Sequence, residues 1–218
     1  CWGKNQTGQL GQDSTTTFGS SGLMGDNLPE IDFGQIKATD SLNLATGRTH
    51  TCVIVNGGQV KCWGSDTFGQ LGSNNGSATD AQTPEEIEAL SPVSLGSNKL
   101  AKQISAGGHF TCALFYDGEV KCWGSNTHGQ LGQDHDTHPV GYGAGDMGDT
   151  LPAVNLGNTA TQITTGEYFA CALLSDGSVK CWGKSTSGNL GQEENQHIGN
   201  DTGELASYDA IKLGTNKT

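Results

Sequence analysis

A repeat of about 60 residues constrains this chain more than any other feature of its sequence. The tripeptide Cys-Trp-Gly occurs four times, and spacings of 61, 60 and 59 residues separate Trp2, Trp63, Trp123 and Trp182. Five residues after each Trp-Gly pair comes a Gly-Gln-Leu-Gly or Gly-Asn-Leu-Gly block, containing Leu10, Leu71, Leu131 or Leu190. A single repeat has too few apolar residues to close a core of its own. Neighbouring repeats are therefore expected to stack on one another.

Each repeat also carries the signals of short antiparallel strands. Two apolar runs flank Asn56-Gly57, Asp117-Gly118 or Asp176-Gly177, and such dipeptides between apolar runs predict a hairpin. Glycine, with 34 of 218 residues, suits the many tight turns that short strands need. A short alternating segment after each variable loop predicts a further strand, at Ile31/Phe33, Val93/Leu95, Val154/Leu156 and Ile211/Leu213. The fold class is all-β.

The order of these blocks resembles a known repeat. Gly-x-x-x-Thr-Cys-Ala-Leu, then Asp-Gly-x-Val-x-x-Trp-Gly, then Gly-Gln-Leu-Gly is similar to the regulator-of-chromosome-condensation repeat, over essentially the whole chain. The resemblance implies a β-propeller, usually of seven four-stranded blades around a central channel. Residues 1–218 are then one propeller segment, with repeats at about 1–46, 47–106, 107–165 and 166–218. At about 60 residues per blade they cover about half of seven blades, so we expect an internal segment of a longer protein.

The cysteines follow the repeat. Three pairs each enclose nine residues around a hairpin tip, namely Cys52/Cys62, Cys112/Cys122 and Cys171/Cys181. Residues that face each other in an antiparallel pair have Cα atoms about 4.5–5.5 Å apart, which a disulfide can span. Zinc is the rival interpretation, but it favours cysteines with two to four residues between them and four converging ligands. We therefore predict three disulfides, with Cys1 unpaired because its counterpart would lie ten positions upstream.

Disulfides indicate an oxidising compartment. The founding member of the resembled family works in the nucleus, which is reducing. The shared fold therefore does not carry its chromatin role or its guanine-nucleotide-exchange activity onto this chain.

Charge and composition limit the partners. The net charge is −12, from 23 acidic and 11 basic residues, and such a surface repels phosphate backbones and anionic lipids. We therefore expect no nucleic-acid partner, and no apolar run is long enough for a membrane span. Asp26 and Asp149, in two near-copies of a Met-Gly-Asp loop, are candidate calcium ligands because Ca²⁺ takes six to eight oxygens. The alternative is that each aspartate caps a tight turn; no other cofactor is expected.

No catalytic motif is recognisable in the sequence. It lacks a Gly-x-Ser-x-Gly elbow, a Walker loop, a His-Glu-x-x-His motif and a recurring carboxylate pair near a histidine. His50 aligns with Phe110 and Phe169 of the other repeats, which is typical of a packing position. His135 and His138 share one short loop that offers too few metal ligands. We expect no enzymatic activity from this segment.

Four Asn-x-Ser/Thr sequons are candidate glycan acceptors in a secreted protein. They are Asn5, Asn75, Asn200 and Asn216. Asn5 has a second interpretation, because Asp66, Asn126 and Ser185 hold the same turn position in the other repeats. Its side chain would then bond to the local backbone.

Variation between the repeats concentrates in polar loops of about 20 to 28 residues, and long loops on a rigid scaffold usually carry recognition. We predict a non-catalytic extracellular scaffold, secreted or on the cell surface, that binds a protein partner through its loops. A subunit of a fibre or surface appendage, with homo-oligomer or filament assembly, would use the exposed sheet edges. The alternatives are a secreted enzyme inhibitor, a carbohydrate-binding propeller, or an enzyme whose site lies in blades outside this segment.

Overall fold

The computed structural model describes residues 1–12, 14–19, 24–31, 43–74, 87, 89–186, 188–192 and 196–211. Within these residues it has three antiparallel sheets of three strands each. The first contains β1 (Asn43–Thr46), β2 (His50–Val55) and β3 (Gln59–Gly64). The second contains β4 (Ala101–Ala106), β5 (Phe110–Phe115) and β6 (Val120–Gly124). The third contains β7 (Ala160–Thr165), β8 (Phe169–Leu174) and β9 (Val179–Gly183).

Helical structure is slight. The short 3-10 helix η1 spans Gly25–Asn27, and the helix α2 spans Glu204–Ser207. Residues 87 and 89 are also helical. The all-β prediction is confirmed, and η1 and α2 lie in the loops that vary between repeats.

The predicted hairpins are confirmed. In each sheet the second and third strands pair antiparallel, and the two cysteines of a repeat face each other, as Cys52 faces Cys62. The turns have the expected backbone, with positive φ at Asn56, Gly118 and Gly177.

Each sheet has three strands where the resemblance implies four. The predicted closing strands at Val93/Leu95 and Val154/Leu156 are not strands in the structure. Each segment instead forms one backbone hydrogen bond with the sheet. For example, Val154 N donates to Val120 O at 2.8 Å. Pro92 and Pro152 stand just before these segments, and a proline cannot donate to a ladder. Phe33 and Leu213 lie outside the described residues.

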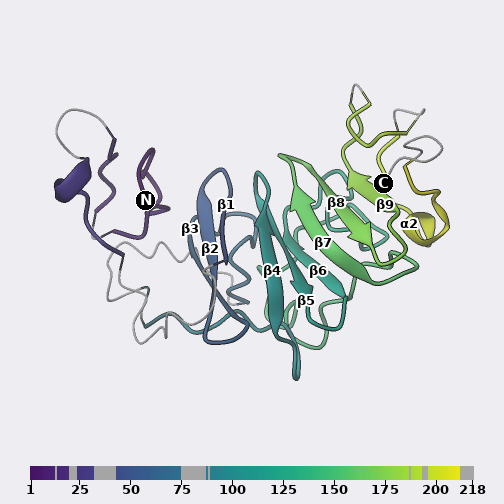
Figure 1. The fold of residues 1–218 in the computed structure, drawn as a ribbon, viewed down its shortest axis with the longest axis horizontal. Helices are drawn as coiled ribbons and strands as arrows, with labels where there is room; N and C mark the ends of the chain where they lie inside the picture. The colour runs from purple at the N-terminus through teal and green to yellow at the C-terminus, as the bar shows by residue number, and fades with distance from the viewer. Residues whose placement is uncertain are drawn as a thin grey trace.

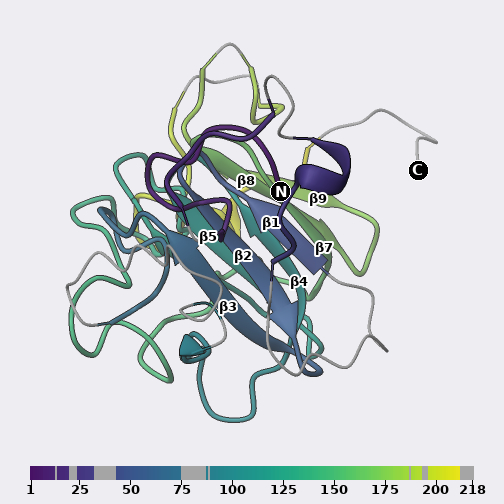
Figure 2. The ribbon, with the colours of Figure 1, turned by 90° about the vertical axis from the view of Figure 1, so that its left-hand side faces the viewer.

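The three sheets lie side by side in chain order (Figure 1) and are stacked face to face when viewed from the left (Figure 2). Their first strands meet, since β1 contacts β4 and β4 contacts β7. The side chain of Gln103 joins two of them, because it donates to Ile163 O at 2.7 Å and accepts from Ile163 N at 3.0 Å. Each sheet is thus one blade-like unit that packs on the next.

Candidate functional site

The boundaries between neighbouring sheets repeat one hydrogen bond. The indole Nε1 of each buried tryptophan donates to the carbonyl of the glutamine in the preceding repeat's Gly-Gln-Leu-Gly turn. The three pairs are Trp63 with Gln9 at 3.1 Å, Trp123 with Gln70 at 3.0 Å and Trp182 with Gln130 at 3.1 Å. All three indoles are fully buried, and a buried indole N–H needs such a partner.

In these three turns the last glycine, Gly11, Gly72 or Gly132, lies against the same indole. At Gly72 the φ angle is +67°, and a Cβ would lie 3.1 Å from Trp123 Nε1 and 2.8 Å from the side chains of Met147 and Val93. A side chain there would be strained by the backbone and by its neighbours. The glycines therefore let the turn approach the next blade.

The three predicted cysteine pairs are joined in the structure. The bonds link Cys52 to Cys62, Cys112 to Cys122 and Cys171 to Cys181, with Cα atoms 4.1, 4.1 and 4.0 Å apart. Cys1 is a free, half-buried thiol. Each bond lies within one sheet, so it fixes a hairpin and does not tie blades together.

A buried lysine in each sheet was missed from the sequence alone. Lys121 Nζ donates to Leu95 O at 2.9 Å and to Gly148 O at 3.0 Å. Lys180 Nζ reaches Leu205 O and Ala206 O in the same way. Burial lowers the pKa of both ammonium groups. The repeated sequence Val-Lys-Cys-Trp-Gly contains this lysine. Its ammonium group donates hydrogen bonds to backbone carbonyls of the variable loop.

One end of the sheets forms a continuous surface, which we call the turn face. It consists of the turns at residues 47–49, 107–109 and 166–168, which connect the first two strands of each sheet. Arg48 N donates to Gly108 O at 3.1 Å, and Gly108 N donates to Glu167 O at 2.9 Å. These turns line a shallow groove of about 530 Å³.

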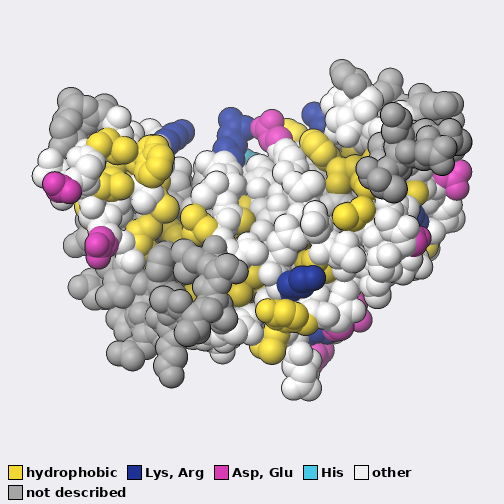
Figure 3. Space-filling model, viewed as in Figure 1, with side chains coloured by type: hydrophobic (Ala, Val, Ile, Leu, Met, Phe, Trp, Pro, Cys, Tyr) yellow, Lys and Arg dark blue, Asp and Glu magenta, His cyan; other side chains and the backbone are white. Residues whose placement is uncertain are grey.

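Charged side chains stand on this face. Arg48 Nη1 lies 3.0 Å from Glu167 Oε1, and both side chains are more than half exposed. An exposed ion pair contributes little to stability. Figure 3 shows basic and acidic side chains side by side along the upper edge of the molecule.

Aromatic and imidazole rings meet at two blade boundaries of the turn face. Phe68 lies 5.0 Å from His109 between the centroids of their rings, and His128 lies 5.5 Å from Tyr168. Lys184 Nζ stands over the Tyr168 ring at 4.9 Å. Phe68 is exposed and the other rings are partly exposed. These pairs could not be predicted from the sequence, because their members come from different repeats.

The imidazoles on this face favour their neutral form. Burial is the main cause that lowers the pKa of His109, and the nearby Arg48 adds to it. Burial also lowers the pKa of His128, together with the neighbouring His197 and Lys184. At neutral pH the rings therefore present flat surfaces without charge.

His50 occupies the packing position that its alignment with Phe110 indicates. It is 1% exposed, and burial lowers its pKa to about 3. Thr111 Oγ1 donates its hydrogen to Gln70 O at 2.9 Å, so it accepts from His50 Nε2 at 2.9 Å. His50 Nδ1 is then a bare acceptor, and it has no hydrogen-bond partner among the described residues.

The two calcium candidates lie in different surroundings. Asp149 accepts bonds from Ser97 N at 2.6 Å and Ser97 Oγ at 2.7 Å, and these bonds lower its pKa. The Lys121 ammonium already takes the neighbouring Gly148 carbonyl. Asp26 is exposed in η1. In the described part of the chain, no three His, Cys, Asp or Glu side chains are grouped to hold a metal ion.

The sequons are placed as follows. Asn5 is fully buried; its Oδ1 accepts from Leu10 N at 2.9 Å and its Nδ2 donates to Ser14 O. The Asn5 side chain thus bonds to the local backbone, which was the second interpretation of this position. A buried, hydrogen-bonded amide does not accept a glycan in the folded state. Asn200 is half-buried, whereas Asn75 and Asn216 lie outside the described residues.

The arrangement defines a class: a repeat protein whose units resemble propeller blades, with a ring-lined surface at one end. Among the described residues no helix is both long and apolar enough to cross a bilayer.

Comparison with known proteins gives the family. Models of the regulator of chromosome condensation (RCC1) repeat match residues 43–70, 101–130 and 160–189, and also 57–114. Together the matches span residues 43–130 and 160–189, which is more than half of the chain. The chain belongs to the RCC1 repeat family.

Two curated relatives and one solved structure show how far the likeness extends. The chain is 29% identical over 215 residues to the mitochondrial RCC1 domain-containing protein RUG3 of Arabidopsis thaliana, covering 92% of the chain and 45% of that protein. It is 28% identical over 201 residues to the ultraviolet-B receptor UVR8 of the same plant, covering 89% and 39%. Yeast RCC1, solved with Kap60, superposes with a TM-score of 0.65 at 19% identity, over 97% of this chain and 44% of that one. The chain thus spans less than half the length of the relatives it matches.

Proposed function

We propose that this chain is a non-catalytic interaction module that binds a protein partner on its turn face. The observation that carries the proposal is the pair of ring contacts, Phe68 with His109 and His128 with Tyr168, beside a shallow groove. Aromatic and arginine side chains are enriched at protein interfaces and often dominate their binding energy. Small-molecule sites, in contrast, enclose most of their ligand.

The family supports a role in binding. One solved relative is a complex of yeast RCC1 with Kap60, and the family-model matches on this chain are to repeats alone. Among the described residues there is no metal-ligand cluster that would support a catalytic alternative.

We further propose that the protein works outside the reducing cytosol, as a secreted or surface-displayed module. The three hairpin disulfides support this location, because disulfides persist in oxidising compartments. Each bond joins the two strands of one hairpin, and a reducing compartment would remove the stability that it adds.

Selection of peptides from a displayed library tests the binding proposal. Peptides that bind the native chain should lose about tenfold or more in affinity when Phe68 and Tyr168 are both changed to alanine. Tyr116→Ala is the matched control, because Tyr116 is 70% exposed at a hairpin tip, at the other end of its sheet. Equal losses in the two variants, or binding that depends only on Tyr116, would contradict the proposal.

A further inference from the structure

One ion pair on the turn face spans the width of a blade. Arg48, Gly108 and Glu167 hold the same position in the three turns, two residues before the strands β2, β5 and β8. Arg48 Nη1 nevertheless lies 3.0 Å from Glu167 Oε1. The charges of the first and third turns therefore meet across the second turn.

Gly108 makes this contact possible. Arg48 N donates to Gly108 O at 3.1 Å and Gly108 N donates to Glu167 O at 2.9 Å, so the three turns are joined through their backbones. A Cβ at Gly108 would lie 2.6 Å from Glu167 O and 3.1 Å from Glu167 Cγ. A side chain there would displace Glu167. The groove between the two charges is therefore lined at this point by bare backbone.

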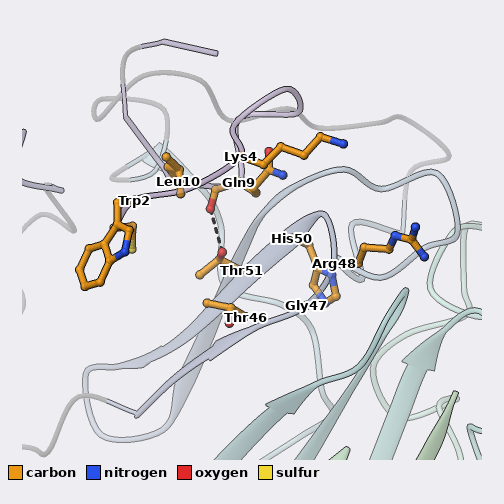
Figure 4. A pocket seen from close by; sticks show the side chains of 10 residues that line it. Trp2, Lys4, Gln9, Leu10, Thr46, Gly47, Arg48, His50 and Thr51 are labelled. Atoms are coloured by element: carbon orange, nitrogen blue, oxygen red, sulfur yellow. Dashed lines mark hydrogen bonds between the residues drawn. The ribbon is translucent and has the colours of Figure 1, made fainter. Parts of the chain in front are cut away.

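The guanidinium of Arg48 is open to a stronger partner than Glu167. Figure 4 shows the Arg48 side chain beside His50 and directed away from Gln9 and Thr51. More than half of each side chain of the ion pair is exposed, and such a pair contributes little to stability. A guanidinium has five N–H donors and binds a carboxylate best in a bidentate pair, whereas the bond to Glu167 uses Nη1 and one oxygen. A carboxylate from a partner can therefore replace Glu167 at a small cost in free energy.

The charge of the turn face is opposite in sign to that of the chain. Within the three turns the charged residues are Arg48 and Glu167, and Lys184 Nζ adds a second cation 4.9 Å from the centre of the Tyr168 ring. These groups carry two positive charges and one negative, on a chain with a net charge of −12. Complementary charge steers a partner to such a patch. A short acidic segment can lie within the patch, whereas nucleic acid would extend onto the acidic remainder of the surface.

We propose that the turn-face groove binds an acidic segment of a protein partner, and that a carboxylate of this segment replaces Glu167 at Arg48. The inference rests on the proposed function, because it names the chemistry of the partner that binds the turn face. Glu167 is then a competitor within the chain, which keeps Arg48 paired until the partner arrives. The ring pairs beside the groove contact the apolar side chains of the same segment.

Peptides selected from a displayed random library on the native 218-residue chain test the inference. The selected sequences should be richer in aspartate and glutamate than the library. Affinity for a synthetic acidic peptide of the selected set should fall about tenfold in Arg48→Gln and rise about threefold in Glu167→Gln, since the competitor is lost. Replacing the aspartates and glutamates of the peptide by asparagine and glutamine should remove both effects.

Glu119→Gln is the matched control for overall charge. Glu119 is also in an exposed ion pair, with Lys99, but it lies in a hairpin turn at the other end of its sheet. The control removes the same negative charge as Glu167→Gln, and it should leave the affinity unchanged. An equal rise in affinity in both variants would show that net charge, and not release of Arg48, governs binding, and it would overturn the proposal.

The remaining outcomes separate this proposal from the proposed function. Selected peptides that need Phe68 and Tyr168, but are not acidic and bind Arg48→Gln equally well, would overturn only the acidic partner. Acidic peptides that need Arg48 but neither ring would overturn only the role of the rings. Peptides unaffected by every variant of the turn face would overturn both. Single-stranded DNA is the polyanion probe, and binding as tight as that of the acidic peptide would also overturn the proposal.

Discussion

The blade boundaries differ sharply between their interior and the turn face. Inside, all three boundaries have the same tryptophan hydrogen bond, with lengths of 3.0 to 3.1 Å. On the turn face the equivalent contacts change, from Thr7 Oγ1 bonded to Thr49 O at 3.2 Å to the ring pairs of Phe68 and His128. One backbone therefore carries a constant buried contact and a variable exposed one. The first contributes to stability, and the second lies on the surface where we propose that a partner binds.

The largest effect should come from removing a buried indole. Trp123→Ala deletes a fully buried side chain and removes one of the two donors to Gln70 O, since Thr111 Oγ1 also donates to this carbonyl. We expect a loss of about 3–5 kcal/mol in the free energy of unfolding. Trp2→Ala is the control, because this indole is 65% exposed and should change stability by no more than about 0.5 kcal/mol. Denaturant titration measures both, and similar losses would break the comparison.

The next effect concerns pH, because His50 holds a position that is phenylalanine in the other sheets. Its pKa of about 3 in the folded state lies below the ordinary value of 6.5. The unfolded chain then binds more protons between these values, so stability is full above pH 6.5 and falls as pH decreases towards 3. The slope is about 1.4 kcal/mol per pH unit, or about 2–3 kcal/mol between pH 6.5 and 4.5.

A His50→Phe variant isolates this contribution from the carboxylates, which also titrate in acid. Gly107 already lies beneath Phe110 as Gly47 lies beneath His50, with similar room for a ring. The variant should lose stability less steeply than the native chain between pH 6.5 and 4.5. Parallel stability–pH curves for the two proteins would contradict the assignment.

A smaller loss should follow from the lysine that anchors the variable loop. Lys121→Met leaves Leu95 O and Gly148 O without their donor, which we expect to cost about 1–3 kcal/mol. Lys102→Met, at an exposed position of β4, is the matched control. Hydrogen exchange should also speed up around residues 147–149 in the first variant only. Unchanged exchange there would show that the lysine does not hold the loop.

The repeat let the fold be predicted, because spacing and turn chemistry recur and each hairpin is a local structure. The hydrogen bond from each indole to the Gly-Gln-Leu-Gly turn was not predicted, because its acceptor is a backbone carbonyl of another repeat. The expected fourth strand of each blade is not confirmed among the described residues, because the closing segments at Val93 and Val154 follow prolines and each makes a single backbone hydrogen bond with its sheet. Lys121 was missed because its partners are backbone carbonyls, which leave no pattern in a sequence. The ring pairs were missed for another reason: Phe68 and His109 meet only once two repeats have stacked.

The smallest effect on stability, and the sharpest on binding, should come from the turn face. Phe68→Thr places there the residue type that Thr7 provides at the first boundary. Phe68 is 37% exposed and its ring contact is at the surface, so the free energy of unfolding should change by about 0.5 kcal/mol or less. Affinity for a peptide selected on the native chain should still fall by about tenfold, because exposed aromatic side chains often dominate an interface. A large loss of stability would make Phe68 a packing residue like the buried tryptophans, and the division between a constant interior and a variable face would fail at this boundary.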